Sequence, residues 1–422
     1  MLNQQTFLTK AASAVPGEFG VKILLLVRQL AHWSELPEGL KCTYFSPQHK
    51  AVAAQLRDWM LSAGLETTID PVGNVIGRYE SDNLAAKTLV VGSHYDTVAN
   101  AGQYDGRLGI LTALVIAEYL RREKLRLPFH LEIIGFSEEE GVRFGAPYIG
   151  SSAIAGRFNE SDLARRDASG VSLAAVLKQE GVDLAAIQKL ARRPESFRGY
   201  LEVHIEQGPV LLQNNLPLGV VTSIAGSVRF RVTIHGIAGH AGTVPMSLRR
   251  DAVAAGAEIV LDVERRCASD AKLVGTVGQF SVPHGLINVI PGCCELSLDV
   301  RSIDDTVRDG AIADILAAIQ KIANRRQVTA TVKEIARHDA VPCAPQMQSA
   351  LAQAIARVGI ETIFLPSGAG HDAEMFAGIT DIGMLFVRCG NGGVSHSPLE
   401  TVTAKDADVA ARVLLDVLVN LH

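Results

Sequence analysis

Acidic and imidazole side chains follow four apolar segments of the sequence, at the points where these segments end. The segments read "LVVGSHYD", "LEIIGFSEEEG", "YLEVHIEQG" and "MLFVRCGNGGVSH". With the adjoining "AGQYDG" they supply five candidate metal ligands, which are His94, Asp105, Glu140, His204 and His396. Imidazoles and carboxylates together form a borderline ligand set that suits zinc and also accepts manganese or cobalt.

Five ligands are more than one tetrahedral zinc ion needs. Two ions that share one bridging carboxylate, roughly 3.5 to 4 Å apart, would account for the number. Each residue alone also has an ordinary explanation, because a histidine at a strand end is often a polar cap and "YDG" is often a turn. The whole pattern favours a metal site, since four strand ends carry such residues while most other loops carry none.

The adjacent carboxylates in "SEEEG" suit hydrolysis. One carboxylate can bind a metal ion while its neighbour points to a water that the metal has acidified and accepts a proton from it. A charged surface loop is the alternative explanation. Glu138 is left over in this scheme, either next to the ligands or on the surface.

The elements that must position these residues alternate along the first half of the chain. Residues 51–65 and 109–125 have helical patterns, whereas residues 88–94 and 130–136 are apolar strands. The alternation predicts an α/β fold, with a mostly parallel sheet and helices on both faces. Ligands of such sheets bind beyond the carboxyl ends of the strands, so the four strand ends could converge on one crevice.

The pattern changes near residue 222. Alternating strands such as "SVRFRVTIHG" and "CELSLDVRS" follow, with helical stretches between and after them. They predict a smaller α+β domain with an antiparallel sheet, inserted at residues 223–336. Residues 1–222 and 337–422 then form one discontinuous metal-binding catalytic domain.

Composition and charge narrow the class of protein. A chain of 422 residues predicts two domains, and 48% hydrophobic with 20% charged residues is typical of a globular enzyme. A net charge of −5 without a basic stripe argues against nucleic acid as a partner. The apolar run Ile23–Val27 is too short for a signal sequence or a membrane span, so a cytoplasmic protein without a membrane partner is expected. The six cysteines form no CxxC pair, which predicts free thiols.

Motifs in a fixed order extend over nearly the whole chain. They read "GSHYDTVANAGQYDGRLG", "EEGVRFG", "HIEQGP", "GIAGHAGTVPM", "NVIPG" ahead of "LDVR", "SGAGHDA" and "VSHSPLE". With these motifs the chain resembles the hydantoinase/carbamoylase family of binuclear-zinc amidohydrolases, relatives of the aminoacylase and carboxypeptidase peptidases. The histidine in "HIEQGP", where the peptidase relatives carry a carboxylate, points to the amidohydrolase branch.

The resemblance implies two divalent ions per subunit, bridged by Asp105. The other ligands would divide into two pairs, His94 with His204 and Glu140 with His396. Zinc is the expected metal, with manganese or cobalt as alternatives.

The resemblance also assigns roles to residues around the metal ions. Glu139 would be the general base and then the proton donor to the leaving nitrogen. Asp96 would hold the second ring nitrogen of His94 and so fix its tautomer. Gln207 would contact the carbamoyl or ureido end of the substrate.

Three residues of the inserted domain match family positions. His240 would polarise the scissile carbonyl, commonly from the partner subunit. Asn288 and Arg301 would hold the substrate carboxylate, a task that suits a planar guanidinium. Ordinary explanations stay open, because Arg301 could form a structural ion pair after Asp299 and Asn288 could be a turn residue.

The segment "SGAGHDA" has two explanations. It fits the G-x-G-x-x-A pattern of a dinucleotide-binding turn, but the next strand, "MLFV", runs into Arg388 instead of an acidic residue. A nucleotide site would also leave the other strand ends unexplained. We therefore expect Gly370 and His371 to contact the substrate, with the glycines allowing a close approach of the backbone.

The resemblance implies a metal-dependent amidohydrolase that cleaves a carbamoyl or ureido C–N bond of a small carboxylate substrate. The wording of "HYDTV" and "AGQYDG" is nearer to the allantoate amidohydrolases. N-carbamoyl-L-amino acids and 3-ureidopropionate are alternative substrates, and dipeptides come after them. The inserted domain is expected to form a homodimer and to close over the site, with hinges near residues 222 and 337. A metal-binding protein that has lost catalysis is the alternative from another class, which intact Glu139 disfavours.

Overall fold

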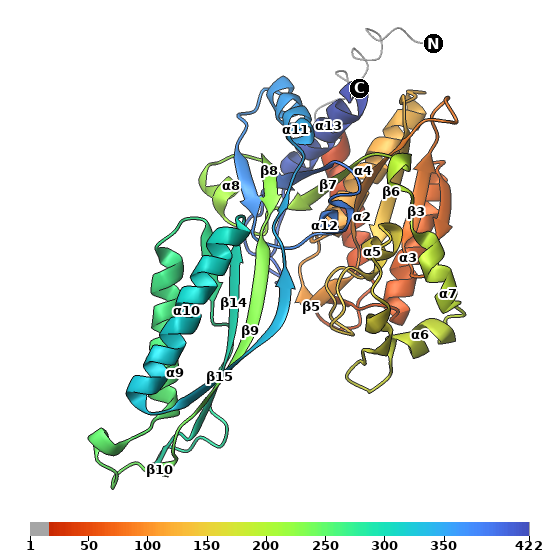
Figure 1. The fold of residues 1–422 in the computed structure, drawn as a ribbon. Coiled ribbons are helices and arrows are strands. Elements are labelled where there is room, and N and C mark those ends of the chain that lie inside the picture. Colours follow the sequence, from red (N-terminus) through yellow and green to blue (C-terminus); the bar gives the residue numbers. More distant parts are fainter. Residues whose placement is uncertain (1–16, 422) are drawn as a thin grey trace. The chain divides into compact units, whose positions relative to one another are not determined.

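The computed structural model describes residues 17–421, which form two compact units (Figure 1). The larger unit combines the described residues up to Thr222 with Cys343–Leu365 and the residues from Gly370 onward. The smaller unit contains Ser223–Pro342 and Pro366–Ala369. None of the described helices is both long and apolar enough to cross a membrane.

The larger unit is built on a nine-stranded mixed sheet. Its strands lie in the order β16-β8-β18-β7-β4-β6-β3-β2, and β17 pairs with β8. Their bounds are β2 Glu66–Ile69, β3 Val75–Tyr79, β4 Thr88–His94, β6 His130–Phe136, β7 Phe197–Ile205, β8 Leu218–Ile224, β16 Val341–Pro342, β17 Phe364–Ser367 and β18 Ile382–Val387. The central strands β18, β7, β4 and β6 are parallel, and β8 and β3 flank them antiparallel. The α/β class is confirmed, with parallel pairing confined to the centre of the sheet.

Buried side chains explain why helices must cover both faces of this sheet. Every residue of β4, β6 and β18 is buried, as is usual for parallel strands. The long helices, whose apolar side chains join the same core, are α2 Glu18–Ala31, α3 Pro47–Ser62, α4 Arg107–Arg122, α11 Pro345–Arg357 and α13 Ala404–Asn420. Shorter helices are α5 Ile149–Ile154, α6 Leu173–Gln179, α7 Leu184–Ile187, α8 Val210–Gln213 and α12 Ala373–Phe376.

The parallel register brings the strand ends to one edge of the sheet. His94, the last residue of β4, lies opposite Phe136, the last residue of β6. His204 of β7 lies opposite Phe386 of β18. The segments that follow these strands therefore start side by side, which is what the sequence pattern required.

The smaller unit is an antiparallel sheet with α9 and α10 against one face, as predicted (Figure 1). The strand order is β11-β14-β9-β15, and β12 pairs with β14. The bounds are β9 Gly226–His235, α9 Ala252–Ala268, β11 Leu273–Thr276, β12 Phe280–Ser281, β14 Cys293–Ser302, α10 Asp305–Arg326 and β15 Thr329–His338. Alternate residues of β9 and β14 are buried, so their neighbours form the opposite face of the sheet.

The chain leaves the smaller unit later than the expected residue 337. Strand β15 pairs with β9 as far as His338, and this pairing keeps the chain in the smaller sheet. The short segment Pro366–Ala369 also belongs to the smaller unit, which the sequence did not indicate. A separate ribbon consists of β10 (Gly239–His240) and β13 (Val289–Ile290).

Candidate metal centre

Asp105 lies at the centre of the predicted ligands. Its Oδ1 atom is 3.1 Å from Nε2 of His204 and 3.6 Å from Nε2 of His94. Its Oδ2 atom is 3.1 Å from Nε2 of His396, and that nitrogen is 3.5 Å from Oε1 of Glu140. The two oxygens of one carboxylate thus face two different sets of ligands.

The spacing of these atoms fits divalent metal ions. Ligand atoms about 2.0 to 2.1 Å from a tetrahedral zinc ion lie roughly 3.3 Å from one another. The candidate atoms of His94, Asp105 and His204 all lie within 4.8 Å of one another, and so do those of Asp105, Glu140 and His396. The structure therefore brings all five predicted ligands together in two groups that share Asp105.

Asp96 fixes the segment that carries the two glutamates. Its carboxylate oxygens accept the backbone N–H of Glu139 at 3.0 Å and of Glu140 at 3.1 Å. Nδ1 of His94 is 3.2 Å from the backbone oxygen of Asp96 and 3.6 Å from its carboxylate. The backbone of Asp96 is thus the nearer partner of the imidazole, while the carboxylate ties the Glu139 loop to strand β4.

The close packing of the Asp105 turn requires a glycine at position 106. Its φ is 65°, and a Cβ at this position would lie 2.4 Å from the backbone oxygen of His94 and 2.6 Å from its ring. Glycine therefore lets the Asp105 turn pack directly against His94. Helix α4 begins at the next residue, Arg107, whose buried Nε donates to the backbone oxygen of Tyr95.

Two residues of the site have a left-handed backbone although they are not glycines. The φ angle is 54° at both Gln207 and His396. Such a conformation costs on the order of 1 to 3 kcal/mol and is held by its surroundings. The Gln207 amide donates to Oδ2 of Asp105 at 3.0 Å and to Oγ of Ser395 at 3.2 Å. Gln207, which we expected at the substrate, therefore contacts the carboxylate of Asp105.

Glu400, which was not among the predicted site residues, supports Asp105. One of its oxygens accepts the backbone N–H of Tyr104 at 2.8 Å and of Asp105 at 3.2 Å, and the other accepts the Ser395 hydroxyl at 2.9 Å. Burial and the charge of Asp105 raise the pKa of Glu400 to about 7. The available sequence signal was the last residue of "VSHSPLE".

His371 packs against His204, one of the predicted metal ligands. It is fully buried, and its ring centroid is 4.5 Å from that of His204 in an edge-on contact. Burial, together with the nearby His204, holds the pKa of His371 well below its ordinary value, so the ring is neutral. A Cβ on Gly370 would lie 2.0 Å from the Tyr148 hydroxyl. Packing therefore accounts for this glycine, and the substrate contacts of both residues stay predictions.

In a dinucleotide-binding turn, backbone N–H groups donate hydrogen bonds to phosphate. In this protein, such N–H groups donate to carboxylates of the protein itself. The N–H of His371 donates to Glu374 at 3.3 Å, and that of Ala373 donates to Glu202 at 3.1 Å. The helix that follows, α12, has four residues. These contacts argue against nucleotide binding at "SGAGHDA".

Burial shifts the pKa values of the three adjacent glutamates upwards. It raises the pKa of Glu139 well above its ordinary value, although the nearby His94 opposes the shift. It raises the pKa of Glu140 to about 7, with Asp105 adding to the effect. Glu138 is completely buried instead of lying on the surface, and burial raises its pKa well above the ordinary value. Burial therefore makes Glu139 a stronger base than an exposed glutamate.

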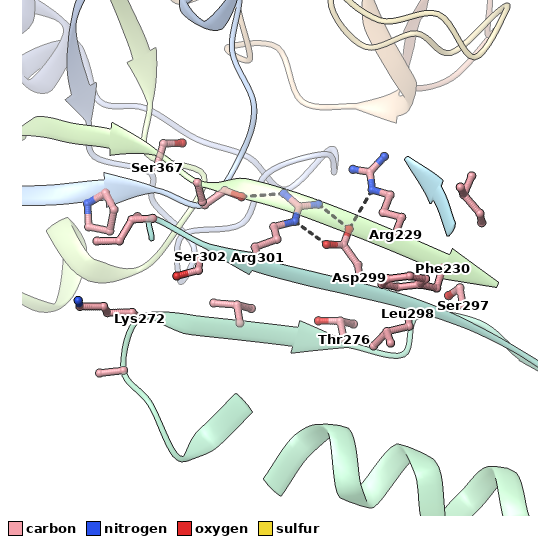
Figure 2. Close-up of a pocket in the computed structure, with 18 of the residues that line it drawn as sticks. Arg229, Phe230, Lys272, Thr276, Ser297, Leu298, Asp299, Arg301, Ser302 and Ser367 are labelled. Atoms are coloured by element: carbon pink, nitrogen blue, oxygen red, sulfur yellow. Dashed lines mark hydrogen bonds and ion pairs between the residues drawn. The ribbon is translucent and has the colours of Figure 1, made fainter. Parts of the chain in front are cut away.

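The remaining predicted residues lie in the smaller unit. His240 of β10 and Asn288, one residue before β13, are exposed, and the N–H of Ala241 donates to the backbone oxygen of Asn288 at 3.0 Å. Figure 2 shows Arg301 of β14 beside Asp299, with Nε and Nη2 each 2.9 Å from a carboxylate oxygen. The ion pair that we considered as the ordinary explanation of Arg301 is therefore present.

A family model and curated relatives match most of the chain. The model described as Peptidase family M20/M25/M40 matches residues 90–420. An allantoate deiminase from Arabidopsis thaliana is 39% identical over 425 residues, covering 93% of this chain and 80% of that protein. An N-carbamoyl-L-amino acid amidohydrolase from Geobacillus stearothermophilus is 40% identical over 376 residues, covering 89% of this chain and 92% of that protein.

Solved structures share the fold over nearly its full length. A hydantoinase/carbamoylase family amidase from Burkholderia multivorans has a TM-score of 0.88 and 30% identity, covering 95% of this chain and 97% of that one. A protein described as AtUAH, solved in complex with glyoxylate, has a TM-score of 0.84 and 30% identity, covering 98% of this chain and 99% of that one. A dinuclear metal binding peptidase of the M20 family from Bacillus subtilis shares the fold, with a TM-score of 0.62 and 16% identity over 96% of this chain and 98% of that one.

The affinity for metal ions should rise with pH. Without metal, Asp105 raises the pKa of His396 to about 9 and burial raises that of Glu140 to about 7, so both residues retain protons near neutrality. Metal ions must displace these protons, and competition weakens as the pH rises from about 6 to about 8. Calorimetric zinc titrations in buffers of different ionisation enthalpy should show proton release, and less of it for His396→Ala. A pH-independent affinity without proton release would contradict this ligand set.

Proposed function

Because the chain belongs to the peptidase family M20/M25/M40 and, within it, to the hydantoinase/carbamoylase amidohydrolases, we propose that it hydrolyses the ureido C–N bond of allantoate. The observation that carries the proposal is the single carboxylate of Asp105, whose two oxygens face separate ligand groups next to Glu139. Allantoate deiminases from plants, at 39% and 40% identity, support allantoate as the substrate.

The second candidate substrate is an N-carbamoyl-L-amino acid. A relative that hydrolyses this class, judged by its name, is as similar to the chain as the allantoate deiminases are. 3-Ureidopropionate carries the same two groups, a carbamoyl nitrogen and a carboxylate, and is a third candidate. Dipeptides lack the carbamoyl group and rank below these compounds.

We further propose that two divalent ions, zinc in the first instance and manganese or cobalt as alternatives, complete the site. His94 and His204 would hold one ion and Glu140 and His396 the other, with Asp105 between them. The bound ions would acidify a water and polarise the substrate carbonyl.

Glu139 is the group that moves the proton. Its backbone is held by the Asp96 carboxylate at 3.0 Å, and its side chain is largely buried. It accepts a proton from the attacking water as the new C–O bond forms, and gives that proton to the nitrogen as the C–N bond breaks. The nitrogen leaves as ammonia when the bond to the terminal NH2 group breaks, or as an amine when the other C–N bond of the carbamoyl carbon breaks.

The smaller unit is proposed to form a homodimer and to deliver His240 to the partner's site. His240 is exposed and belongs to the smaller unit, whereas the candidate metal ligands belong to the larger one. Large apolar side chains are exposed in the segments around β10 and β13, namely Ile237, Met246, Leu248, Leu286 and Ile287. An exposed cluster of this kind is typical of a surface that a second protein covers.

The hinges near residues 222 and 337 and the cytoplasmic location stay predictions.

Ammonia release tests the substrate class. Protein loaded with zinc or manganese is incubated side by side with allantoate, N-carbamoyl-L-amino acids and 3-ureidopropionate, and with dipeptides in a parallel assay for released amino acids. We expect the highest kcat/KM with allantoate, and loss of activity after treatment with a chelator. Higher kcat/KM with an N-carbamoyl amino acid would replace allantoate by the second candidate, and activity on none of these compounds would remove the substrate proposal.

Glu139→Gln should separate catalysis from metal binding. The substitution removes the proton acceptor but keeps the shape of the side chain, so kcat should fall about 10²- to 10⁴-fold while the bound metal content is unchanged. Glu195→Gln is the control, because that side chain is 66% exposed. An unchanged rate in Glu139→Gln would mean that the protein binds metal without using this residue in catalysis.

Subunit complementation tests the role of His240. The variants His240→Ala and Glu139→Gln are each expected to be nearly inactive. After the two are mixed and the subunits exchange, half of the dimers are mixed, and each mixed dimer has one intact site. Activity should then recover to about a quarter of the wild-type value. Exchange without recovery would show that His240 acts within its own subunit or not at all.

A further inference from the structure

A pocket of about 420 Å³ lies in the larger unit, at the amino ends of its parallel strands. Thr88 and His130, which line it, are the first residues of β4 and β6, and Ser196 directly precedes β7. The predicted metal ligand His94 is the last of the seven residues of β4. Roughly 20 Å of strand therefore separates this pocket from the candidate metal centre.

Basic side chains outnumber acidic ones around the pocket. The arginines and lysines that line it are Arg78, Lys87, Arg192 and Arg193, and the acidic residues are Glu132 and Glu195. This local surplus of positive charge contrasts with the net charge of −5 of the whole chain. It favours an anionic ligand.

Glu132 holds two of the guanidiniums in place. Its side chain is 6% exposed, and its Oε1 accepts a hydrogen bond from Nη1 of Arg78 at 2.6 Å. Its Oε2 accepts one from Nη1 of Arg192. The pairing of β3 with β6 places Arg78 directly opposite Glu132, so this contact follows from the register of the sheet. Neither guanidinium can turn away without leaving a buried charge poorly paired.

Both guanidiniums keep hydrogen-bond donors that the protein does not use. None of the described residues accepts a hydrogen bond from Nη2 of Arg78, or from Nε or Nη2 of Arg192. The side chain of Arg192 is only 25% exposed. Donors at this depth are normally bonded to a ligand or to water when the protein provides no acceptor.

Lys87 and Arg193 line the exposed part of the pocket. The side chain of Arg193 is 85% exposed, and its Nε lies 3.5 Å from the exposed carboxylate of Glu195, a weak kind of pair. Lys87 is also exposed and has no ion-pair partner among the described residues. Both charges can therefore turn towards a bound anion at little cost.

We propose that this pocket binds a phosphate group, either of a small organic phosphate or of free phosphate. The proposal does not depend on the proposed function. A phosphate group carries about −1.5 to −2 charges near neutral pH, which offsets the surplus of basic side chains better than a single carboxylate does. Arginine forks match its oxygens. Leu84, Ala85 and Ala86 line another part of the pocket, whose volume is that of a small-molecule site, so an attached organic group has room.

Calorimetric titration of the metal-loaded protein with inorganic phosphate, at constant ionic strength, tests the site. The wild type should bind phosphate with a Kd of about 1 mM or lower. Arg192→Ala should raise this Kd about 10- to 100-fold, the usual loss for hydrogen bonds to a charged group. Arg192→Lys keeps the charge but loses the fork, and should give an intermediate Kd. Phosphate bound to the metal ions would respond to neither substitution.

A double variant that removes only exposed charges guards against damage to the fold. Lys87→Ala/Arg193→Ala should raise the Kd about tenfold and leave the Tm without phosphate unchanged. The matched control is Arg57→Ala/Arg126→Ala, which removes the same charge from exposed positions of the larger unit outside the pocket. A Kd within twofold of this control in both pocket variants would overturn the proposal. Wild-type protein without saturable phosphate binding would do so as well.

Glycerol phosphate and succinate identify the kind of anion. We expect glycerol phosphate to bind more tightly than inorganic phosphate, because its organic part can occupy the remaining space. Weaker binding of glycerol phosphate would assign the pocket to free phosphate. Succinate, a dianion of two carboxylates, should bind more weakly than either compound. Equal affinity for succinate and phosphate would refute the phosphate group as the ligand.

Discussion

The structure of the larger unit depends on how one buried carboxylate is satisfied. Asp105 is 3% exposed, and an isolated charge at such a depth would be strongly destabilising. Three imidazoles and the Gln207 amide surround its oxygens, and Glu400 holds its backbone. These partners come from β4, β7 and the segment after β18, so satisfying Asp105 fixes the relative positions of three loops.

The parallel sheet brings these loops together with little loss of conformational entropy. Parallel neighbours in register end at the same edge, so ligands that lie far apart in sequence arrive together without long, ordered loops. At a few positions the site needs unusually close packing or an unusual backbone conformation. Gly106 provides close packing on His94, and Gln207 and His396 carry a left-handed backbone. Strain of this kind is tolerated because the surrounding contacts over-determine each position.

Features that depend on hydrophobic periodicity and on residue type could be predicted from the sequence. Buried runs such as residues 88–94 predicted the strands, and their polar endings predicted five side chains that the structure brings together as candidate ligands. The sequence could not predict contacts made to backbone N–H groups, because an acceptor such as Asp96 or Glu400 has no fixed spacing from the groups it holds. The sequence also left open whether Glu138 lies on the surface or near the ligands. The structure buries this side chain, and burial raises its pKa. Partners set by sheet register, such as Arg229 and Asp299, need the structure as well.

The charges around the candidate metal centre set a condition on the recognition of an anionic substrate. The candidate metal centre collects four carboxylates, Asp96, Asp105, Glu139 and Glu140, in the segments that follow β4 and β6. An anionic substrate is repelled by such a cluster unless cations are bound there, and the bound cations serve the reacting carbonyl more than the distant carboxylate. Recognition of that carboxylate therefore calls for separate positive charge. Within the smaller unit, two guanidiniums, those of Arg229 and Arg301, share the one carboxylate of Asp299, so this group as a whole is positive.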